Sequence, residues 1–130
     1  MRHKAAFSNF RGRMKIFLIC SVRCVSAETA IKQVEYVKSL ESIGYTVHYP
    51  PRDTNQSASG LEICRENFNA MFRCDEVHVF YEPGSQGTHF DMGMAFALNR
   101  RVVAVNVGEL PPGKSFARML IEWEACRVVR

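Results

Sequence analysis

The segment from Ser85 to Leu98 holds a single carboxylate, Asp91, where a loop passes into a pattern of small and apolar residues. We expect Asp91 in about the first turn of a helix, facing a ligand crevice. Gly87 would allow a tight backbone turn before that helix, and Gly93 would allow the helix to approach a sheet closely. A carboxylate in this place can attack or stabilise an electron-poor centre. Alternatively, it only stabilises the positive end of the helix, a role that contributes about 0.3–1 kcal/mol.

A second carboxylate, Glu66, stands on the preceding predicted helix, between Arg65 and Asn67. Two carboxylates over one crevice suit the cleavage of a glycosidic bond, because one can trap or stabilise an oxocarbenium-like state while the other manages protons. Taken alone, Glu66 equally fits a solvated helix face, where an exposed ion pair contributes little. The pair therefore gives a hypothesis that depends on how the two side chains lie.

The turn Ser21-Val22-Arg23 comes directly after the first strand-like run. A hydroxyl, a guanidinium and backbone N–H groups can converge there on an anion such as a phosphate. Ser and Arg are also ordinary turn residues, so both interpretations stay open. His89 and Phe90 stand beside Asp91: a histidine can titrate near neutrality, and an aromatic ring can stack on a base. Both residues are equally compatible with a structural role.

The segment from Gly108 to Ser115 fits the G-x-x-x-x-G-K-S pattern of phosphate-binding loops, and it stands between a predicted strand and a predicted helix. Pro111 and Pro112, however, lack the backbone N–H groups with which such a loop cradles phosphates. Too little chain follows for a strand with a magnesium-binding acid. We therefore interpret the match as coincidental and do not predict an NTPase, although Lys114 and Ser115 remain suited to a nucleotide phosphate.

Strand-like and helix-like segments alternate along the chain. We expect strands at residues 15–20, 45–49, 77–81 and 102–107, and helices at residues 27–43, 61–72, 90–98 and 116–126. The first helix is capped by Ser26 and has an apolar stripe of Ile31, Val34, Val37, Leu40 and Ile43. This alternation predicts parallel β-α units and hence a three-layer α/β sandwich. Ligands bind beyond the carboxyl ends of such strands, so the loops there, including residues 52–60 and 82–87, are expected to line one site.

The composition bounds the class of protein. With 130 residues, of which 47% are hydrophobic, the chain suffices for one domain, which we place at residues 14–130 after a basic leader at residues 1–13. No apolar run approaches the roughly 20 residues of a membrane span, and no secretory signal is evident, so we expect a soluble cytoplasmic protein without a membrane partner. The basic residues form no stripe with interleaved aromatics, which argues against DNA or RNA binding.

The cysteines argue against both a disulfide framework and a zinc site. There are five, an odd number, and their spacing matches no common set of zinc ligands. They are Cys20, Cys24, Cys64, Cys74 and Cys126. We expect reduced and mostly buried thiols, and the sequence implies no metal and no other cofactor.

Three motifs, KIFLICSVR, RENFNAMFRCDEVHVF and SQGTHFDMGMAFAL, resemble in their order the nucleoside 2-deoxyribosyltransferase family over nearly all of residues 14–125. The resemblance implies a flavodoxin-like (Rossmann-like) parallel sheet in a three-layer α/β/α sandwich. It also implies a homodimer or higher oligomer in which a neighbouring chain completes each site. Asp91, followed by Met92 and Gly93, takes the place of the family's nucleophile, which is usually the longer Glu. Glu66 falls where the family has an acid before the third strand.

Within that family, the chain resembles the branch that hydrolyses nucleoside 5′-monophosphates, including 2′-deoxynucleoside 5′-phosphate N-hydrolases and CMP hydrolases. That branch has a Ser-hydrophobic-Arg turn after the first strand, which Ser21-Val22-Arg23 matches. It has a serine six residues before the nucleophile, which Ser85 matches, and a serine from the partner subunit, which Ser115 can supply. A hydroxyl at Ser85 can donate to a phosphate, whereas the acids that the transferases tend to have there would repel it.

The resemblance thus implies an N-glycosidase that hydrolyses the base–sugar bond of a (deoxy)nucleoside 5′-monophosphate. Asp91 would attack or stabilise the anomeric carbon, and Glu66 would position the sugar and handle protons. The predicted substrate-binding residues are Ser21, Arg23, Ser85, Gly87, Phe90 and Ser115. Two alternatives stay open: a nucleoside 2-deoxyribosyltransferase that exchanges bases, and a catalytically silent nucleotide-binding protein, which the shorter carboxylate would suit. The sequence identifies neither the base nor the sugar.

Overall fold

The computed structural model describes residues 13–126 of the chain. Its strands form one sheet in the order β2-β1-β3-β4, and each pair of neighbours is parallel. The strands are β1 (Lys15–Ile19), β2 (Thr46–His48), β3 (Glu76–Phe80) and β4 (Arg101–Asn106). The predicted strands are confirmed, with ends that shift by one residue. Of the predicted leader at residues 1–13, only Arg13 belongs to the described part.

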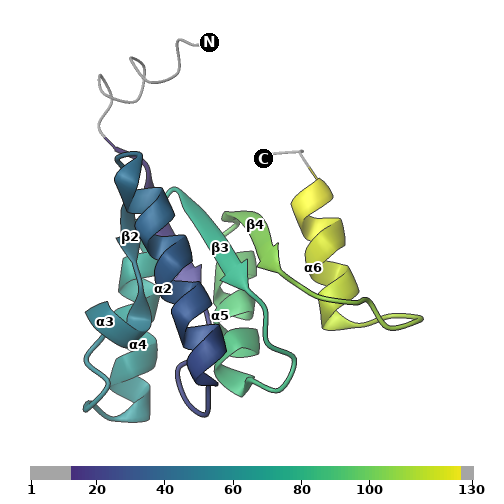
Figure 1. Ribbon diagram of the computed structural model, residues 1–130, viewed down its shortest axis with the longest axis horizontal. Helices are drawn as coiled ribbons and strands as arrows, with labels where there is room; N and C mark the ends of the chain where they lie inside the picture. The colour runs from purple at the N-terminus through teal and green to yellow at the C-terminus, as the bar shows by residue number, and fades with distance from the viewer. Residues whose placement is uncertain (1–12, 127–130) are drawn as a thin grey trace.

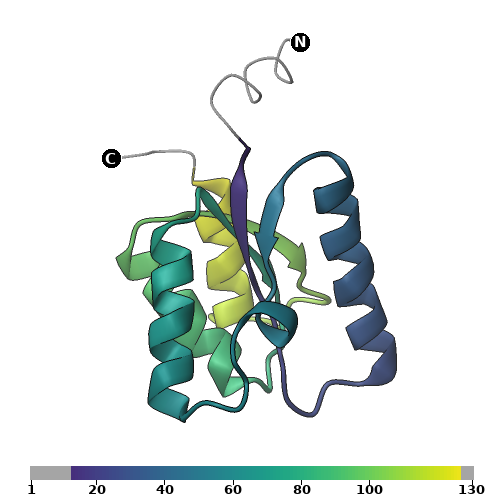
Figure 2. The ribbon, with the colours of Figure 1, turned by 90° about the vertical axis from the view of Figure 1, so that its left-hand side faces the viewer.

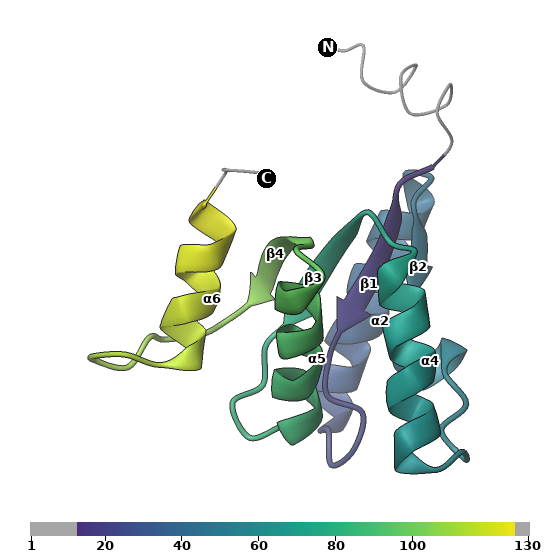
Figure 3. The same ribbon diagram turned by 180° about the vertical axis from the view of Figure 1, so that it is seen from behind.

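The helices lie on both faces of the sheet. They are α2 (Ala27–Ser42), α3 (Pro50–Asp53), α4 (Gly60–Phe72), α5 (Gln86–Ala97) and α6 (Phe116–Ala125). α2 covers one face, as Figure 1 shows, and α4 and α5 cover the other, which Figure 3 shows from behind. The side view in Figure 2 separates the three layers. The fold is therefore the predicted three-layer α/β/α sandwich with a flavodoxin-like sheet.

α6 stands beside β4, at the end of the sheet (Figure 1). Oε2 of Glu124 on α6 accepts a hydrogen bond of 2.9 Å from the backbone N–H of Ala104 on β4. The carboxylate thus satisfies a donor of an edge strand that has no strand partner on that side.

β1 is buried on both faces, because successive side chains of a strand point to opposite sides. Phe17 and Ile19 join the core cluster beneath α4 and α5. Ile16 and Leu18 join the cluster beneath α2. The nearly continuous apolar run KIFLIC therefore reports a central strand, as expected from the sequence.

A serine caps each of the four longer helices, and its Oγ accepts from the backbone N–H three residues further on. The caps are Ser26, Ser59, Ser85 and Ser115. Each such helix follows a strand of a parallel sheet, so all four N-termini gather where the strands end. We call this end of the sheet, which is the lower one in Figure 1, the carboxyl edge.

The apolar stripe predicted for α2 is wrong in part. Val37 and Leu40 are buried, as expected, whereas the other members are exposed. These are Ile31, Val34 and Ile43. Gln33 takes the remaining inward position and is only 1% exposed. A polar side chain can be buried there because its amide nitrogen and its amide oxygen each have a hydrogen-bond partner, which a pattern of hydrophobicity does not reveal.

The inward face of α4 is not formed by its large apolar residues. Leu61, Phe68 and Phe72 repeat at helical spacing, as a core stripe would, but all three are exposed. The buried residues of α4 are Asn67 and Met71. α4 therefore presents an apolar surface outward and a polar amide inward.

α5 begins at Gln86, earlier than predicted, so Gly87 lies inside the helix rather than in a turn before it. A Cβ added at Gly87 would meet only Oγ of Ser85, at 3.9 Å, and one added at Gly93 would meet nothing within 4 Å. The tight turn predicted at Gly87 and the close approach predicted at Gly93 are therefore wrong, whereas the substrate-binding role of Gly87 stays a prediction. Asp91 lies in the second turn of α5, beyond the reach of the helix-end effect, which falls off within the first turn.

All five cysteines are free, but the expectation that most are buried is wrong. Cys20 and Cys74 are buried, whereas Cys24 and Cys126 are exposed. None of the helices in residues 13–126 combines the length and the hydropathy that crossing a bilayer requires.

Candidate active site

Asp91 lies on the inward face of α5 and is 8% exposed. Burial raises the pKa of its carboxyl to about 7, because the charged form loses its solvation. Near neutral pH the side chain is therefore present in both protonation states. Such a group can act as a nucleophile when it is ionised and as a proton donor when it is not.

The side chain of Asp91 acts on Cys20, the residue that follows β1. Burial and then the neighbouring Asp91 raise the pKa of the Cys20 thiol to about 12. The thiol therefore stays protonated at neutral pH and is a poor nucleophile. Of the Cys20 thiol and the Asp91 carboxyl, only the carboxyl can therefore ionise near neutral pH.

The turn after β1 is held from within. Ser21 is buried, and its Oγ donates to the backbone carbonyl of Arg23 at 3.2 Å. The carbonyl of Ser21 accepts from Nε2 of Gln33 on α2 at 3.2 Å. The side chain of Arg23 is exposed at the carboxyl edge. The turn is thus hydrogen-bonded in place and presents a guanidinium at the carboxyl edge, while its part in binding a phosphate stays a prediction.

Gln33 also joins this turn to the end of β2. The hydroxyl of Tyr49 donates to Oε1 of Gln33 at 3.0 Å, and both side chains are buried. The charge of a Cys20 thiolate would in turn raise the pKa of Tyr49, although burial is the larger cause. Gln33 and Tyr49 were missed by the sequence analysis, because neither stands in a motif.

His89 connects β3, α5 and α6 at the carboxyl edge. Its Nδ1–H donates to the carbonyl of Ser85 at 2.7 Å, since a carbonyl oxygen can only accept. In the neutral ring, Nε2 is then the acceptor for the hydroxyl of Tyr81, at 2.9 Å. The ring of Phe116 packs edge-on against the imidazole, with centroids 5.1 Å apart. His89 therefore has a positioning role, one of the two possibilities that the sequence left open.

A cavity of about 370 Å³ opens beside His89. Its walls are Pro83, Gly84, Ser85, Gln86, His89 and Phe116. Oγ of Ser85 accepts from the N–H of Thr88 at 3.1 Å, which leaves its own hydrogen to donate elsewhere. Among the predicted substrate-binding residues, Ser85 alone lines this cavity. Gly87 and Phe90 are exposed outside it.

The loop from Gly108 to Ser115 is held by Arg118. Its Nε donates to the carbonyl of Gly113 at 2.9 Å, and its Nη2 donates to the carbonyl of Pro111 at 2.8 Å. Ser115 caps α6 and directly precedes Phe116, which lines the cavity of the same chain. That a partner chain supplies Ser115 stays a prediction.

Glu66 contacts the segment that follows α3. Its Oε1 accepts from the backbone N–H of Asn55 at 3.2 Å. Glu66 also raises the pKa of His48, but burial has the larger effect and lowers it. The raised pKa of Asp91 has burial as its cause, with no contribution from Glu66. Glu66 thus interacts with His48 at the end of β2, whereas Asp91 interacts with Cys20 after the end of β1.

Asn67 is the polar residue that α4 turns inward. Its Oδ1 accepts from the hydroxyl of Thr54 at 2.7 Å, and Oγ1 of Thr54 lies 2.8 Å from Nε2 of His48. The imidazole of His48 stacks on the ring of Phe17, with centroids 5.1 Å apart. These contacts hold the end of β2 against α4. The sequence analysis placed Asn67 beside Glu66 but assigned it no role.

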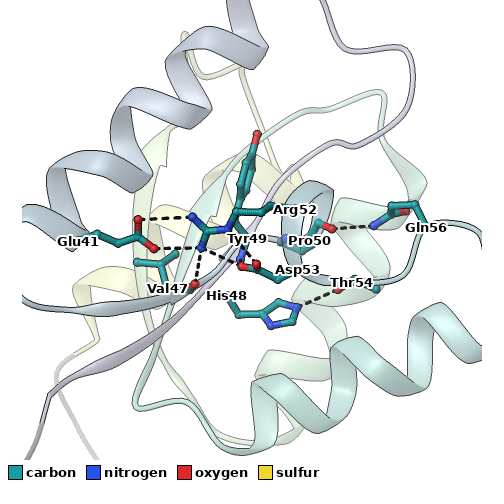
Figure 4. A network of polar contacts seen from close by, with 9 residues as sticks. All are labelled: Glu41, Val47, His48, Tyr49, Pro50, Arg52, Asp53, Thr54 and Gln56. Carbon is teal, nitrogen blue, oxygen red and sulfur yellow. Dashed lines mark hydrogen bonds and ion pairs between the residues drawn. The ribbon is translucent and has the colours of Figure 1, made fainter.

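The predicted open loop at residues 52–60 is instead a braced segment (Figure 4). Arg52 belongs to α3, and its guanidinium contacts Glu41, Asp53 and the carbonyl of Val47. The carboxylate of Asp53 accepts from the N–H of Tyr49 at 2.8 Å. Hydrogen bonds to Glu41 and Asp53 hold the pKa of Arg52 above its usual range. The segment therefore has a defined shape at the carboxyl edge.

A second cavity, of about 970 Å³, lies between β4 and α6. Its walls include Arg101 at the start of β4 and Cys126 after the end of α6, so it opens at the opposite edge of the sheet. None of the predicted site residues lines it. Within residues 13–126, no group of three or more His, Cys, Asp or Glu side chains is placed to hold a metal ion.

Comparison with protein-family models finds no match, and comparison with the curated proteins finds no relative. Several solved structures are similar, among them the following two. The CMP N-glycosidase BcmB of Clostridium botulinum is 25% identical over 69% of this chain and 69% of that chain, with a TM-score of 0.53. A 2-deoxyribosyltransferase from the psychrotolerant bacterium Bacillus psychrosaccharolyticus is 17% identical over 75% of this chain and 76% of that chain, with a TM-score of 0.61. The second likeness is one of fold, and both neighbours are enzymes.

Proposed function

We propose that this chain, which is nucleoside 2-deoxyribosyltransferase-like in its fold and structural neighbours, hydrolyses the base–sugar bond of a nucleoside 5′-monophosphate. The observation that carries the proposal is a buried carboxylate, Asp91, at the same edge of the sheet as the turn that bears Arg23. The carboxylate can attack the anomeric carbon of a nucleotide, and the guanidinium of Arg23 can bind its phosphate. The printed activity of the first neighbour, CMP N-glycosidase, supports the same class of substrate.

In the proposed reaction, ionised Asp91 forms a bond to the anomeric carbon while the bond from that carbon to the base nitrogen breaks. The electron pair leaves with the base, which takes up a proton from Glu66. Water then attacks the anomeric carbon and gives a proton back to Glu66 while the bond to Asp91 breaks, so the sugar phosphate departs and both carboxyl groups return to their starting states. The buried surroundings of Asp91 exclude bulk water until the base has left.

The remaining predicted residues divide into two groups. Arg23, Ser85 and a serine at position 115 of a second chain hold the phosphate, joined by Ser21 once its hydroxyl turns away from the carbonyl of Arg23. Glu66 positions the sugar and handles protons from the side of β2, where it already binds the N–H of Asn55. Gly87 and Phe90 lie on the exposed side of α5, where the ring of Phe90 can stack on a base.

The test is an incubation of the purified protein with ribo- and deoxyribonucleoside monophosphates and with free nucleosides, with chromatography of the released base. We expect release from at least one monophosphate and none with Asp91→Ala. No release from any of them, together with equal binding by Asp91→Asn, would instead support the silent nucleotide-binding protein.

Base exchange is the second candidate, favoured by the fold shared with a 2-deoxyribosyltransferase. A buried nucleophile excludes water, which would let a second base capture the sugar. The same incubation with an added free base distinguishes the two, because transfer yields a new nucleoside and hydrolysis does not.

We also propose that two copies of the chain associate. Leu61, Phe68 and Phe72 leave an exposed apolar surface on α4, which is 13 residues long, and the rings of Phe68 and Phe72 stack with centroids 6.3 Å apart. Exposed apolar surface of this kind marks interaction sites. We infer a homodimer in the cytoplasm, in keeping with the expected shared sites.

A further inference from the structure

Thr88 is a buried side chain whose hydroxyl has no partner. It is 0% exposed, and among the described residues its Oγ1 is the one buried side-chain nitrogen or oxygen without a hydrogen bond. Buried polar groups are nearly always paired, since an unpaired one loses its hydration without compensation. The unpaired hydroxyl of Thr88 therefore suggests that it forms a hydrogen bond in another state of the protein, such as the substrate complex.

Thr88 stands on the same face of α5 as Asp91. The buried residues of this helix are Thr88, Asp91, Met92 and Ala95. Side chains three residues apart on a helix are neighbours, with Cβ atoms about 5–6 Å from each other. The backbone N–H of Thr88 is already bound to Oγ of Ser85, so the orphan is the hydroxyl alone.

The other titratable groups at this edge do not offer Asp91 a donor of this kind. Cys20, after β1, carries a thiol that burial, and then Asp91, keeps protonated, and a thiol is only a weak donor. On the β2 side, Tyr49 donates to Gln33, and Glu66 of α4 acts on His48. On the β3 side, the hydroxyl of Tyr81 bonds to His89. Thr88 thus supplies an unpaired hydroxyl on the same buried face of α5 as the Asp91 carboxylate.

We propose that Thr88 is a positioning residue whose hydroxyl donates to one oxygen of the ionised Asp91 carboxylate and turns the other oxygen toward the sugar. The pairing requires a rotation of the Thr88 side chain or of the Asp91 carboxylate, because the two are not hydrogen-bonded in the resting fold. Hydrogen bonds to a charged acceptor are roughly twice as strong as neutral ones, so the pairing favours the ionised carboxylate. This inference rests on the proposed function, in which Asp91 is the nucleophile.

The decisive variants are Thr88→Val, which keeps the shape and removes the hydroxyl, and Thr88→Ser, which keeps the hydroxyl. Because the hydroxyl is unpaired in the resting fold, we expect Thr88→Val to melt at the same or a higher temperature than the wild type. We expect its kcat to fall by about tenfold or more while KM changes little, and Thr88→Ser to recover most of the loss. A loss of kcat that merely follows a lower melting temperature would overturn the proposal.

A second measurement does not depend on activity. The carboxyl carbon of Asp91 can be titrated by NMR in the wild type and in Thr88→Val. Loss of the donor should move the midpoint upward by about one pH unit, and Thr88→Ser should restore it. An unchanged midpoint would overturn the pairing. A shifted midpoint in a protein that releases no base would uphold the pairing and count only against the proposed function.

Discussion

The hydroxyl of Tyr49 donates a hydrogen bond of 3.0 Å to Oε1 of Gln33, and Nε2 of the same amide donates to the carbonyl of Ser21 at 3.2 Å. One buried side chain of α2 therefore ties the end of β2 to the turn after β1. Because the amide uses both its donor and its acceptor in this bridge, the position of the turn depends on Gln33. The turn carries the proposed phosphate contacts, so the bridge links packing to substrate binding.

Replacing Gln33 by Leu should weaken both the fold and the grip on a monophosphate. Each of the two groups left unpaired in the interior costs about 1–3 kcal/mol, so the midpoint of urea unfolding should fall clearly. KM for the monophosphate should rise more than kcat falls, because the turn loses its anchor. Tyr49→Phe keeps the bond from Gln33 to Ser21 and should give a smaller rise. Equal KM values in all three proteins would contradict the linkage.

Replacing Asp91 by Asn should stabilise the protein at neutral and alkaline pH. Burial raises the pKa of Asp91 from 3.8 to about 7, so between these values the folded state keeps a proton that the unfolded state releases. The wild type is therefore most stable below about pH 4 with respect to this group, and it loses stability as the pH rises toward 7. At about 1.4 kcal/mol per pH unit over about three units, the loss is on the order of 4 kcal/mol.

Urea unfolding of the wild type and of Asp91→Asn between pH 4 and pH 8 tests this expectation. Other carboxylates contribute to both proteins, so the difference between the two isolates Asp91. The variant should match the wild type near pH 4 and exceed it at pH 8. A variant that is less stable than the wild type at pH 8 would show that hydrogen bonds to the ionised carboxylate, such as the one proposed from Thr88, outweigh the cost of burying its charge.

Replacing Arg23 by Ala should affect monophosphates more than nucleosides. The exposed guanidinium on the turn is proposed to bind the phosphate, so its loss should raise KM for a monophosphate by about tenfold or more, as for a hydrogen bond to a charged group. Any turnover of a free nucleoside should stay unchanged. Lys38→Ala removes an exposed positive charge from α2 and serves as the control. A similar rise in KM in the control would indicate a general effect of net charge.

Replacing Phe72 by Ser should weaken self-association. Phe72 is 59% exposed on α4 and lies next to the ring of Phe68, so it contributes apolar area to the proposed contact between copies. Sedimentation velocity should show a dimer for the wild type and a shift toward monomer for the variant. Ile43→Ser removes an apolar side chain with 66% exposure from the end of α2, on the other face, and should leave the dimer intact.

Strand positions followed directly from the sequence, whereas the inward faces of the helices did not. Runs such as KIFLIC and VHVF can only be central strands in a chain of this length, and Ser26 marked the start of α2 correctly. Gln33 and Asn67 took inward positions that apolar periodicity assigned to other residues. Their burial depends on partners from other elements, namely Tyr49 and Thr54, and no local pattern reports such partners.

The candidate site was predictable in its position but not in its connections. Parallel β-α units place loops at one edge, so Asp91 and Ser21 could be assigned to that edge from the order of elements alone. The orphaned hydroxyl of Thr88 and the tautomer of His89 arise from packing between α5 and its neighbours. Such features appear only when distances are known.

Glu66 allows a sharper test than either acid alone, because its contact in the fold and its proposed chemistry can be separated. Glu66→Gln keeps an oxygen to accept from the N–H of Asn55, at 3.2 Å in the wild type, but cannot transfer a proton. Glu66→Ala loses both. We expect the two variants to lose kcat to a similar extent, about 100-fold or more, as for the removal of a general acid or base.

The melting temperatures distinguish the two roles of Glu66. Only Glu66→Ala should also melt earlier, because it alone leaves the N–H of Asn55 without its acceptor. If Glu66→Gln retains full activity while Glu66→Ala does not, the residue serves only to hold the segment after α3. Proton handling would then fall to water, because Asp91 is bonded to the anomeric carbon while the base leaves.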